Sequence, residues 1–136
     1  MKRSFKYGIG LVLASSLFVS CETDTDPTTQ DYQAEYLGIW DCNEKTGVNS
    51  PQFYEVNISA GPSENSIIIN NLYQTGTAIQ ATISGGFSLT FPSQTSENII
   101  FSGSGSANAN FGQISLNFTA DDGSAVQDVV EAVLVK

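Results

Sequence analysis

The fold is clearest in one stretch near the end of the chain, Ile114-Ser115-Leu116-Asn117-Phe118-Thr119-Ala120. Apolar and polar residues alternate here without interruption, which is the period of a strand that buries one face. An amphipathic helix would instead place its apolar residues three and four positions apart. The stretch therefore predicts a β-strand with its apolar side against a core.

The same alternation recurs along the chain from about residue 35 onward. It predicts eight strands, at about 36–43, 52–60, 65–72, 77–84, 86–91, 98–107, 112–120 and 127–135. Turn-forming residues separate them, including Gly61-Pro62, Asn70-Asn71, Gly85-Gly86, Pro92-Ser93 and Asp121-Asp122-Gly123. No stretch of ten or more residues keeps a helical period.

Short links between successive strands favour an antiparallel meander. Eight such strands can close on themselves, and closure removes the exposed edges. We therefore expect an all-β domain that forms a single small up-and-down barrel. A two-sheet β-sandwich is the alternative.

The N-terminal residues have the layout of a secretory signal. Lys2, Arg3 and Lys6 form a basic start, and residues 7–19 are apolar or small and uncharged. This apolar run is too short for a permanent transmembrane helix. Residues 1–20 are therefore predicted to be a cleaved signal peptide.

The signal ends in Phe18-Val19-Ser20-Cys21, which resembles a lipobox, although Phe stands where Leu is usual. The resemblance implies lipid attachment at Cys21, and two or three acyl chains anchor a protein stably. Residues 21–34 are predicted to be an acidic, flexible tether, and residues 35–136 the barrel domain. We expect a lipoprotein of the outer membrane, with the leaflet left open.

The charge balance restricts the partners. After cleavage only Lys45 and Lys136 remain as cations, against all 14 acidic residues, so the formal charge is 2 − 14 = −12. Nucleic-acid affinity depends on cations that neutralise phosphates, so nucleic-acid binding is excluded. The charge suits solubility at a cell surface or a basic protein partner.

The chain contains no histidine. This excludes Ser-His-Asp and Cys-His catalysis and the usual zinc sites. We expect no enzyme activity, no cofactor and no metal. If Cys21 carries lipid, Cys42 has no partner within the chain, and it is either buried as a small apolar residue or available for intermolecular disulfides.

The aromatic residues are the remaining candidates for a site. Trp40, Tyr54, Phe87 and Phe101 can line a ligand pocket at an open barrel end, or they can simply fill the barrel. Two carboxylates, Glu55 and Glu131, are predicted to point outward from their strands, where solvation is their expected role.

The stretch Tyr36-Leu37-Gly38-Ile39-Trp40 contains the Gly-x-Trp motif and resembles the first strand of lipocalins and related calycins. That resemblance implies that Trp40 packs near the closed end, under a cation that Lys136 can supply. More broadly, the chain resembles small Bacteroidetes lipoproteins with a calycin-like domain, through Phe101-Ser102-Gly103-Ser104-Gly105 and the Asp122-Gly123 turn. The resemblance implies a fold and a cellular location more than an activity.

Two functions are compatible with these features. The first is a non-catalytic binding module for a small apolar ligand or a protein partner. The alternative is an inhibitor of lysozyme or another basic hydrolase, because Trp40-Asp41-Cys42 resembles the aromatic-x-Cys opening of small lipoprotein inhibitors of that kind. The second cysteine of those inhibitors is missing from this chain.

Overall fold

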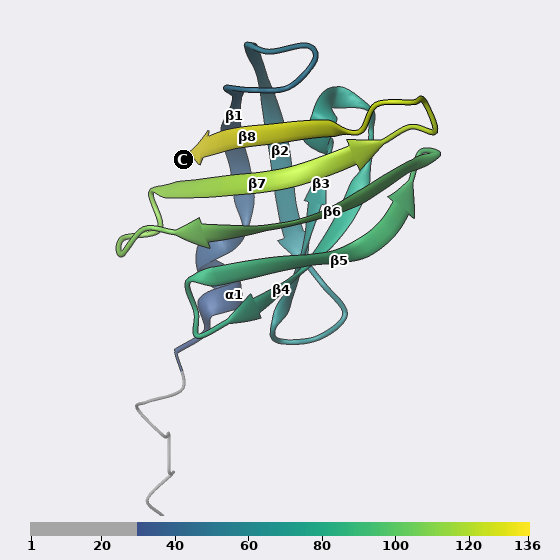
Figure 1. Ribbon diagram of the computed structural model, residues 1–136. Helices are drawn as coiled ribbons and strands as arrows, with labels where there is room; N and C mark the ends of the chain where they lie inside the picture. Colours follow the sequence, from purple (N-terminus) through teal and green to yellow (C-terminus); the bar gives the residue numbers. More distant parts are fainter. Residues whose placement is uncertain (1–29) are drawn as a thin grey trace, which may run out of the picture.

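A computed structural model describes residues 30–136 (Figure 1). The predicted signal peptide, Cys21 and most of the predicted tether lie outside these residues. The described part contains a short helix, α1 (Tyr32–Tyr36), one 3-10 turn, η1 (Leu72–Gln74), and eight strands. The strands are β1 (Gly38–Glu44), β2 (Gln52–Ala60), β3 (Ser66–Asn70), β4 (Ala78–Ser84), β5 (Ser88–Ser96), β6 (Ile99–Ala107), β7 (Gln113–Asp121) and β8 (Asp128–Val135).

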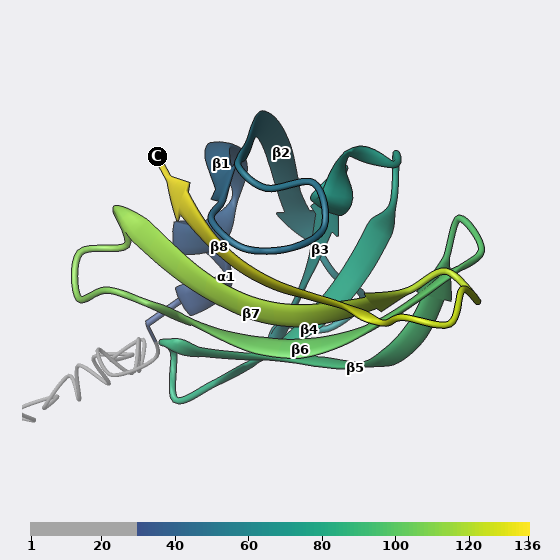
Figure 2. The same cartoon turned by 45° about the horizontal axis from the view of Figure 1, so that its top comes forward.

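The eight strands form one closed antiparallel barrel. Each strand pairs with the next along the chain, and β8 pairs with β1, so the sheet has no free edge. Figure 2 shows β5 to β8 curving around one side, with β1 to β3 completing the wall behind them. The prediction of an up-and-down barrel is confirmed, and the sandwich alternative is wrong. No helix within residues 30–136 has the length and apolar character needed to cross a membrane.

The inward-facing side chains fill the barrel. Alternate positions on most strands are buried, and the largest completely enclosed side chains include Trp40, Phe101 and Phe118. The Ser-Gly-Ser-Gly stretch of β6 has small side chains. A Cβ on Gly103 would collide with the carbonyl oxygen of Asn117 and would lie 2.6 Å from the Cα of Phe118. Glycine at this position therefore allows β6 to pack closely against β7.

Helix α1 closes one end of the barrel, here called the α1 end. Asp31 caps the helix by accepting a hydrogen bond from the Ala34 amide at 3.2 Å. The Tyr36 hydroxyl donates to the Gly86 carbonyl at 2.7 Å, and Trp40 Nε1 donates to the Tyr36 carbonyl at 2.8 Å. Helix α1 begins at Tyr32, so residues 32–34, which the sequence assigns to the flexible tether, are helical here and help to cover this end.

Strand β5 is longer than predicted, because Pro92-Ser93 does not form a turn. The β5–β6 register shifts between Phe91 and Gln94, and this bulge accommodates the proline. The Gln94 side chain then bonds to both the amide and the carbonyl of Gln80 on β4, each at 2.8 Å. A side-chain amide thereby continues the β4–β5 ladder beyond the bulge.

The opposite end, here called the η1 end, is covered by the segment between β3 and β4. Leu72 is fully buried there. The Tyr73 ring packs edge-on against Phe101 and Phe118, with centroids 6.1 and 6.3 Å apart. Both ends of the barrel are therefore covered by aromatic side chains.

Candidate functional site

The four aromatic residues proposed to bind a ligand do not come together. Trp40 and Phe101 are fully buried parts of the core. Tyr54 points inward near the η1 end, where its hydroxyl donates to Glu44. Phe87 lies at the α1 end and stacks on Phe111 with a centroid distance of 5.0 Å. These side chains fill or cover the barrel and do not line one common cavity.

A buried polar cluster at the η1 end was not anticipated. Glu44 and Asp128 are only 3% and 7% exposed. Tyr54 donates to Glu44, and the Tyr73 hydroxyl donates to Asp128 at 2.6 Å. The Tyr73 amide donates in turn to the Tyr54 hydroxyl at 2.8 Å, so the two pairs form one network. The sequence indicates part of this cluster, because Glu44 falls on the same inward-facing alternate positions of β1 as Trp40.

Burial within the cluster shifts the pKa values of its titratable side chains. Burial raises the pKa of Glu44 above its ordinary value; the hydrogen bond from Tyr54 opposes this shift, and the charge of Asp128 adds to it. Burial also raises the pKa values of Tyr54 and Tyr73, so both hydroxyls remain protonated donors. The network holds two acidic groups together through two neutral tyrosines.

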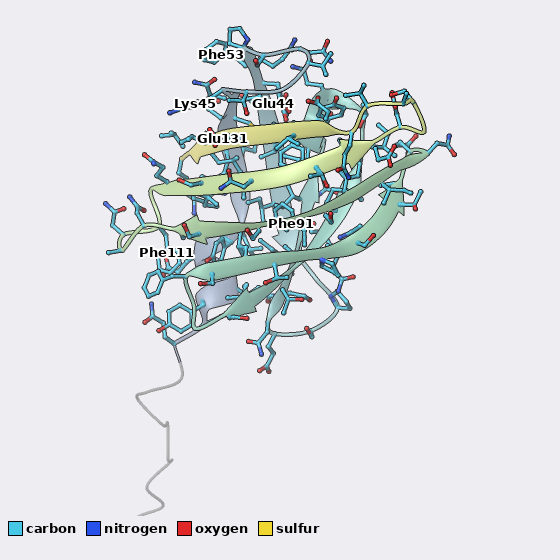
Figure 3. The ribbon with its side chains drawn as sticks, viewed as in Figure 1. Glu44, Lys45, Phe53, Phe91, Phe111 and Glu131 are labelled. Carbon is cyan, nitrogen blue, oxygen red and sulfur yellow. The ribbon has the colours of Figure 1, made fainter. Side chains whose placement is uncertain are left out.

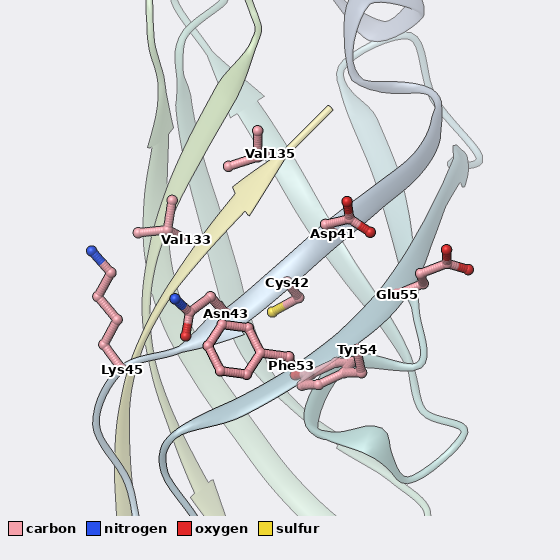
Figure 4. Close-up of a pocket in the computed structure, with 9 residues that line it drawn as sticks. All are labelled: Asp41, Cys42, Asn43, Lys45, Phe53, Tyr54, Glu55, Val133 and Val135. Atoms are coloured by element: carbon pink, nitrogen blue, oxygen red, sulfur yellow. The ribbon is translucent and has the colours of Figure 1, made fainter.

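A groove runs across the outer face of β8, β1 and β2 (Figure 4). Its volume is about 550 Å³, and its lining comprises Asp41, Cys42, Asn43, Lys45, Phe53, Tyr54, Glu55, Val133 and Val135. Figure 3 places Phe53 and Lys45 at the end of the molecule opposite to Phe111. We call this feature the outer groove.

One cross-strand row in the outer groove is largely apolar. Asn43 pairs with Phe53 on β2 and with Val133 on β8, so their outward side chains lie abreast. Phe53 is 72% exposed. The Asn43 Oδ1 atom is buried and has no hydrogen-bond partner among the described residues. A buried acceptor without a partner costs roughly 1–3 kcal/mol, and rotation of the Asn43 side chain to meet an external donor would relieve this cost.

The neighbouring row is acidic. Asp41 pairs directly with Glu55 on β2 and with Val135 on β8. Like charges directly opposite one another destabilise a sheet, so this pair does not serve stability. Both carboxylates are exposed, and Val135 beside them is 48% exposed.

Neither lysine of residues 30–136 neutralises this acidic pair. In Figure 4 the Lys45 side chain points away from Asp41 and Glu55. Lys136 is engaged at the α1 end, where its Nζ donates to the Glu35 carbonyl at 2.9 Å. The outer groove thus combines exposed apolar side chains, two unpaired carboxylates and one acceptor without a partner.

Cys42 borders the outer groove through its backbone, but its side chain points into the barrel. It is a free cysteine, 2% exposed, and burial raises the pKa of its thiol to about 11. Of the two alternatives that the sequence leaves open, burial as a small apolar residue is the one observed. The thiol is neither exposed nor ionised at neutral pH.

Within residues 30–136, no group of three or more Cys, Asp or Glu side chains is arranged to hold a metal ion.

Glu55 and Glu131 are both exposed, as predicted. Glu131 lies on β8 outside the groove lining, whereas Glu55 belongs to the groove. The two glutamates also differ in their cross-strand neighbours, because Glu55 pairs with another carboxylate and Glu131 pairs with Asn117.

Comparison with known proteins supports the fold alone. No protein-family model matches the chain. No curated protein sequence matches it either. Among solved structures, the chain is similar to a redesigned beta barrel, with a TM-score of 0.52 and 14% identity over 79% of this chain and 96% of that one. The molecule is a small eight-stranded antiparallel β-barrel.

Proposed function

We propose that this protein is a non-catalytic binding module that holds a basic protein partner through the outer groove. The observation that carries the proposal is the apolar row of exposed Phe53 and half-buried Val133 beside the acidic pair of Asp41 and Glu55. Exposed apolar side chains next to unpaired charges are typical of interaction sites rather than of solvated strand faces.

A protein partner is favoured over a small apolar ligand inside the barrel. The interior positions are occupied by the barrel's own side chains, with Trp40 and Phe101 fully buried. The outer groove, by contrast, is already open to solvent. The partner is expected to be basic because the described residues carry 11 acidic side chains and two lysines.

The alternative function uses the same face. Lysozyme and similar hydrolases are basic, and an acidic groove is complementary to them. In that case lysozyme would bind at the outer groove and lose activity in proportion to occupancy. Binding without inhibition would leave the general proposal standing and reject the inhibitor alternative.

The proposal includes a lipid anchor in the outer membrane, with the leaflet left open. It rests on the signal-like residues 1–20 and on the lipobox-like sequence that ends at Cys21. Labelled palmitate should enter the protein in its own host, and Cys21→Ala should abolish both labelling and membrane association. Labelling that persists in the variant would contradict the anchor.

A peptide-display selection tests the groove directly, because it does not require the partner to be identified first. Random peptides are selected on the full-length protein, on a Phe53→Ser/Val135→Ser double variant, and on an Ile100→Ser/Val126→Ser control. The control removes two other exposed apolar side chains, which lie outside the groove. We expect basic, apolar peptides to be enriched on the native protein and the control only. Equal enrichment on all three would contradict the proposed function.

A further inference from the structure

The acidic row of the outer groove has no evident role in the folded protein itself. Asp41 and Glu55 oppose each other across β1 and β2, although like charges in that position repel. The two lysines of the described residues are directed elsewhere. A cation supplied from outside would convert this repulsion into attraction.

The apolar side chains beside the acidic row define the shape of that cation. Val135 pairs with Asp41, and Val133 and Phe53 flank Asn43 in the adjacent row. A compact ion would leave these apolar side chains uncovered. A long side chain with an apolar stem and a charged head would cover them and place its head beside the carboxylates.

The orphaned acceptor selects between the two candidate cationic side chains. Asn43 Oδ1 lacks a donor among the described residues, and because this atom is covered, the side chain must rotate to meet a donor from outside. A guanidinium presents five N–H donors in a planar fork, so it can bond a carboxylate and a neighbouring amide oxygen together. It also stacks on aromatic rings such as Phe53. An ammonium group lacks this fork.

From these features we infer that the outer groove binds an arginine side chain of the partner, with its guanidinium at Asp41 and Glu55, its stem along Val133 and Val135, and an N–H on Asn43 Oδ1 once the Asn43 side chain has rotated outward. This inference rests on the proposed function and adds the identity of the anchoring residue. Phe53 is the most exposed side chain of the apolar row, so its ring is free to cover the arginine stem from the solvent side.

The test uses three peptides with the sequence acetyl-Gly-Val-Xaa-Val-Gly-amide, in which Xaa is arginine, citrulline or lysine. Citrulline keeps the length and the planar head of arginine but has no charge. Affinity for the full-length protein is measured by NMR titration at low and at high salt. We expect the citrulline peptide to bind about tenfold more weakly than the arginine peptide, and the difference to shrink with salt.

Variants of the protein complete the experiment. Asp41→Asn and Glu55→Gln should each weaken the arginine peptide about tenfold and leave the citrulline peptide unchanged. Glu97→Gln, the same loss of charge in the β5–β6 hairpin, should change neither. Thermal melts establish that each variant is folded.

Two results would overturn the inference in distinguishable ways. If the citrulline peptide or the lysine peptide binds as tightly as the arginine peptide, and Phe53→Ser still abolishes binding, the guanidinium site is rejected and the proposed function stays intact. Binding that is indifferent to Phe53→Ser as well as to Asp41→Asn would reject both.

Discussion

The Lys136 amine lies 5.0 Å from the centroid of the Trp40 ring, so the residue that follows β8 packs over a residue of β1. The same amine donates to the Glu35 carbonyl at the end of α1. One cation thereby joins the last strand, the first strand and the helix that covers the α1 end. The relationship implied by the Gly-x-Trp resemblance is confirmed.

Replacement of this cation should loosen the α1 end. Lys136→Met keeps the length of the stem but removes the cation–π contact and the hydrogen bond. We expect the free energy of unfolding to fall by about 1–2 kcal/mol, measured by urea denaturation followed by circular dichroism. Lys45→Met, at an exposed position, should change it by less than about 0.5 kcal/mol. An equal effect of the two variants would contradict this role of Lys136.

Cys42 should be inert in the folded protein. A Cys21→Ser variant leaves Cys42 as the only thiol, and Ellman's reagent at pH 8 reports its accessibility. Because Cys42 is buried and burial raises its pKa to about 11, we expect reaction only after guanidinium unfolds the barrel. Rapid labelling of the native protein, or a disulfide-linked dimer on a non-reducing gel, would contradict the buried assignment.

Glu44 should make stability depend on pH. Its pKa is raised in the folded state, so the folded protein binds this proton more tightly than the unfolded chain does. The resulting stabilisation is complete below the unfolded pKa of about 4.3 and is lost as pH rises through the folded pKa. Glu44→Gln cannot titrate, and it retains an acceptor for Tyr54.

We therefore expect the free energy of unfolding of Glu44→Gln, relative to the native protein, to increase from pH 4 toward neutral pH. Urea denaturation at intervals of pH measures this difference. Glu131→Gln removes an exposed carboxylate of β8 and serves as the control for general charge effects. A difference that stays constant or declines with rising pH would show that Glu44 does not carry the raised pKa.

The acidic pair of the outer groove should cost stability. Asp41→Asn removes the repulsion of Asp41 by Glu55, so we expect the free energy of unfolding to rise by about 0.5 kcal/mol. Glu55→Gln should do the same, and the double variant should gain less than the sum, because one repulsion is removed only once. Additive effects, or destabilisation by Asp41→Asn, would contradict the view that the pair is kept for binding.

Much of the fold could be predicted from the sequence, because period-two alternation reports directly which face of a strand is buried. The eight strands appear near their predicted positions, and turn residues separate most of them correctly. Pro92 is the exception, because a proline usually ends a strand. Here a bulge after Phe91 and the side chain of Gln94 compensate for the lost pairing.

The candidate site was less accessible to sequence reasoning. Alternation shows that Asp41 and Glu55 point outward, but only the β1–β2 register shows that they face each other. The missing partner of Asn43 Oδ1 likewise depends on atomic packing. The buried cluster was more predictable, since Glu44 continues the inward series of β1 and Asp128 that of β8.

The most direct test of the central claim is chemical-shift mapping with a peptide selected on the native protein. Isotope-labelled protein is titrated, and the backbone amide shifts are assigned to residues. We predict that the largest shifts fall on Asn43, Phe53 and Val133, and that Phe53→Ser/Val135→Ser abolishes them. Shifts centred on Tyr73 at the η1 end, or on Phe87 at the α1 end, would contradict partner binding at the outer groove.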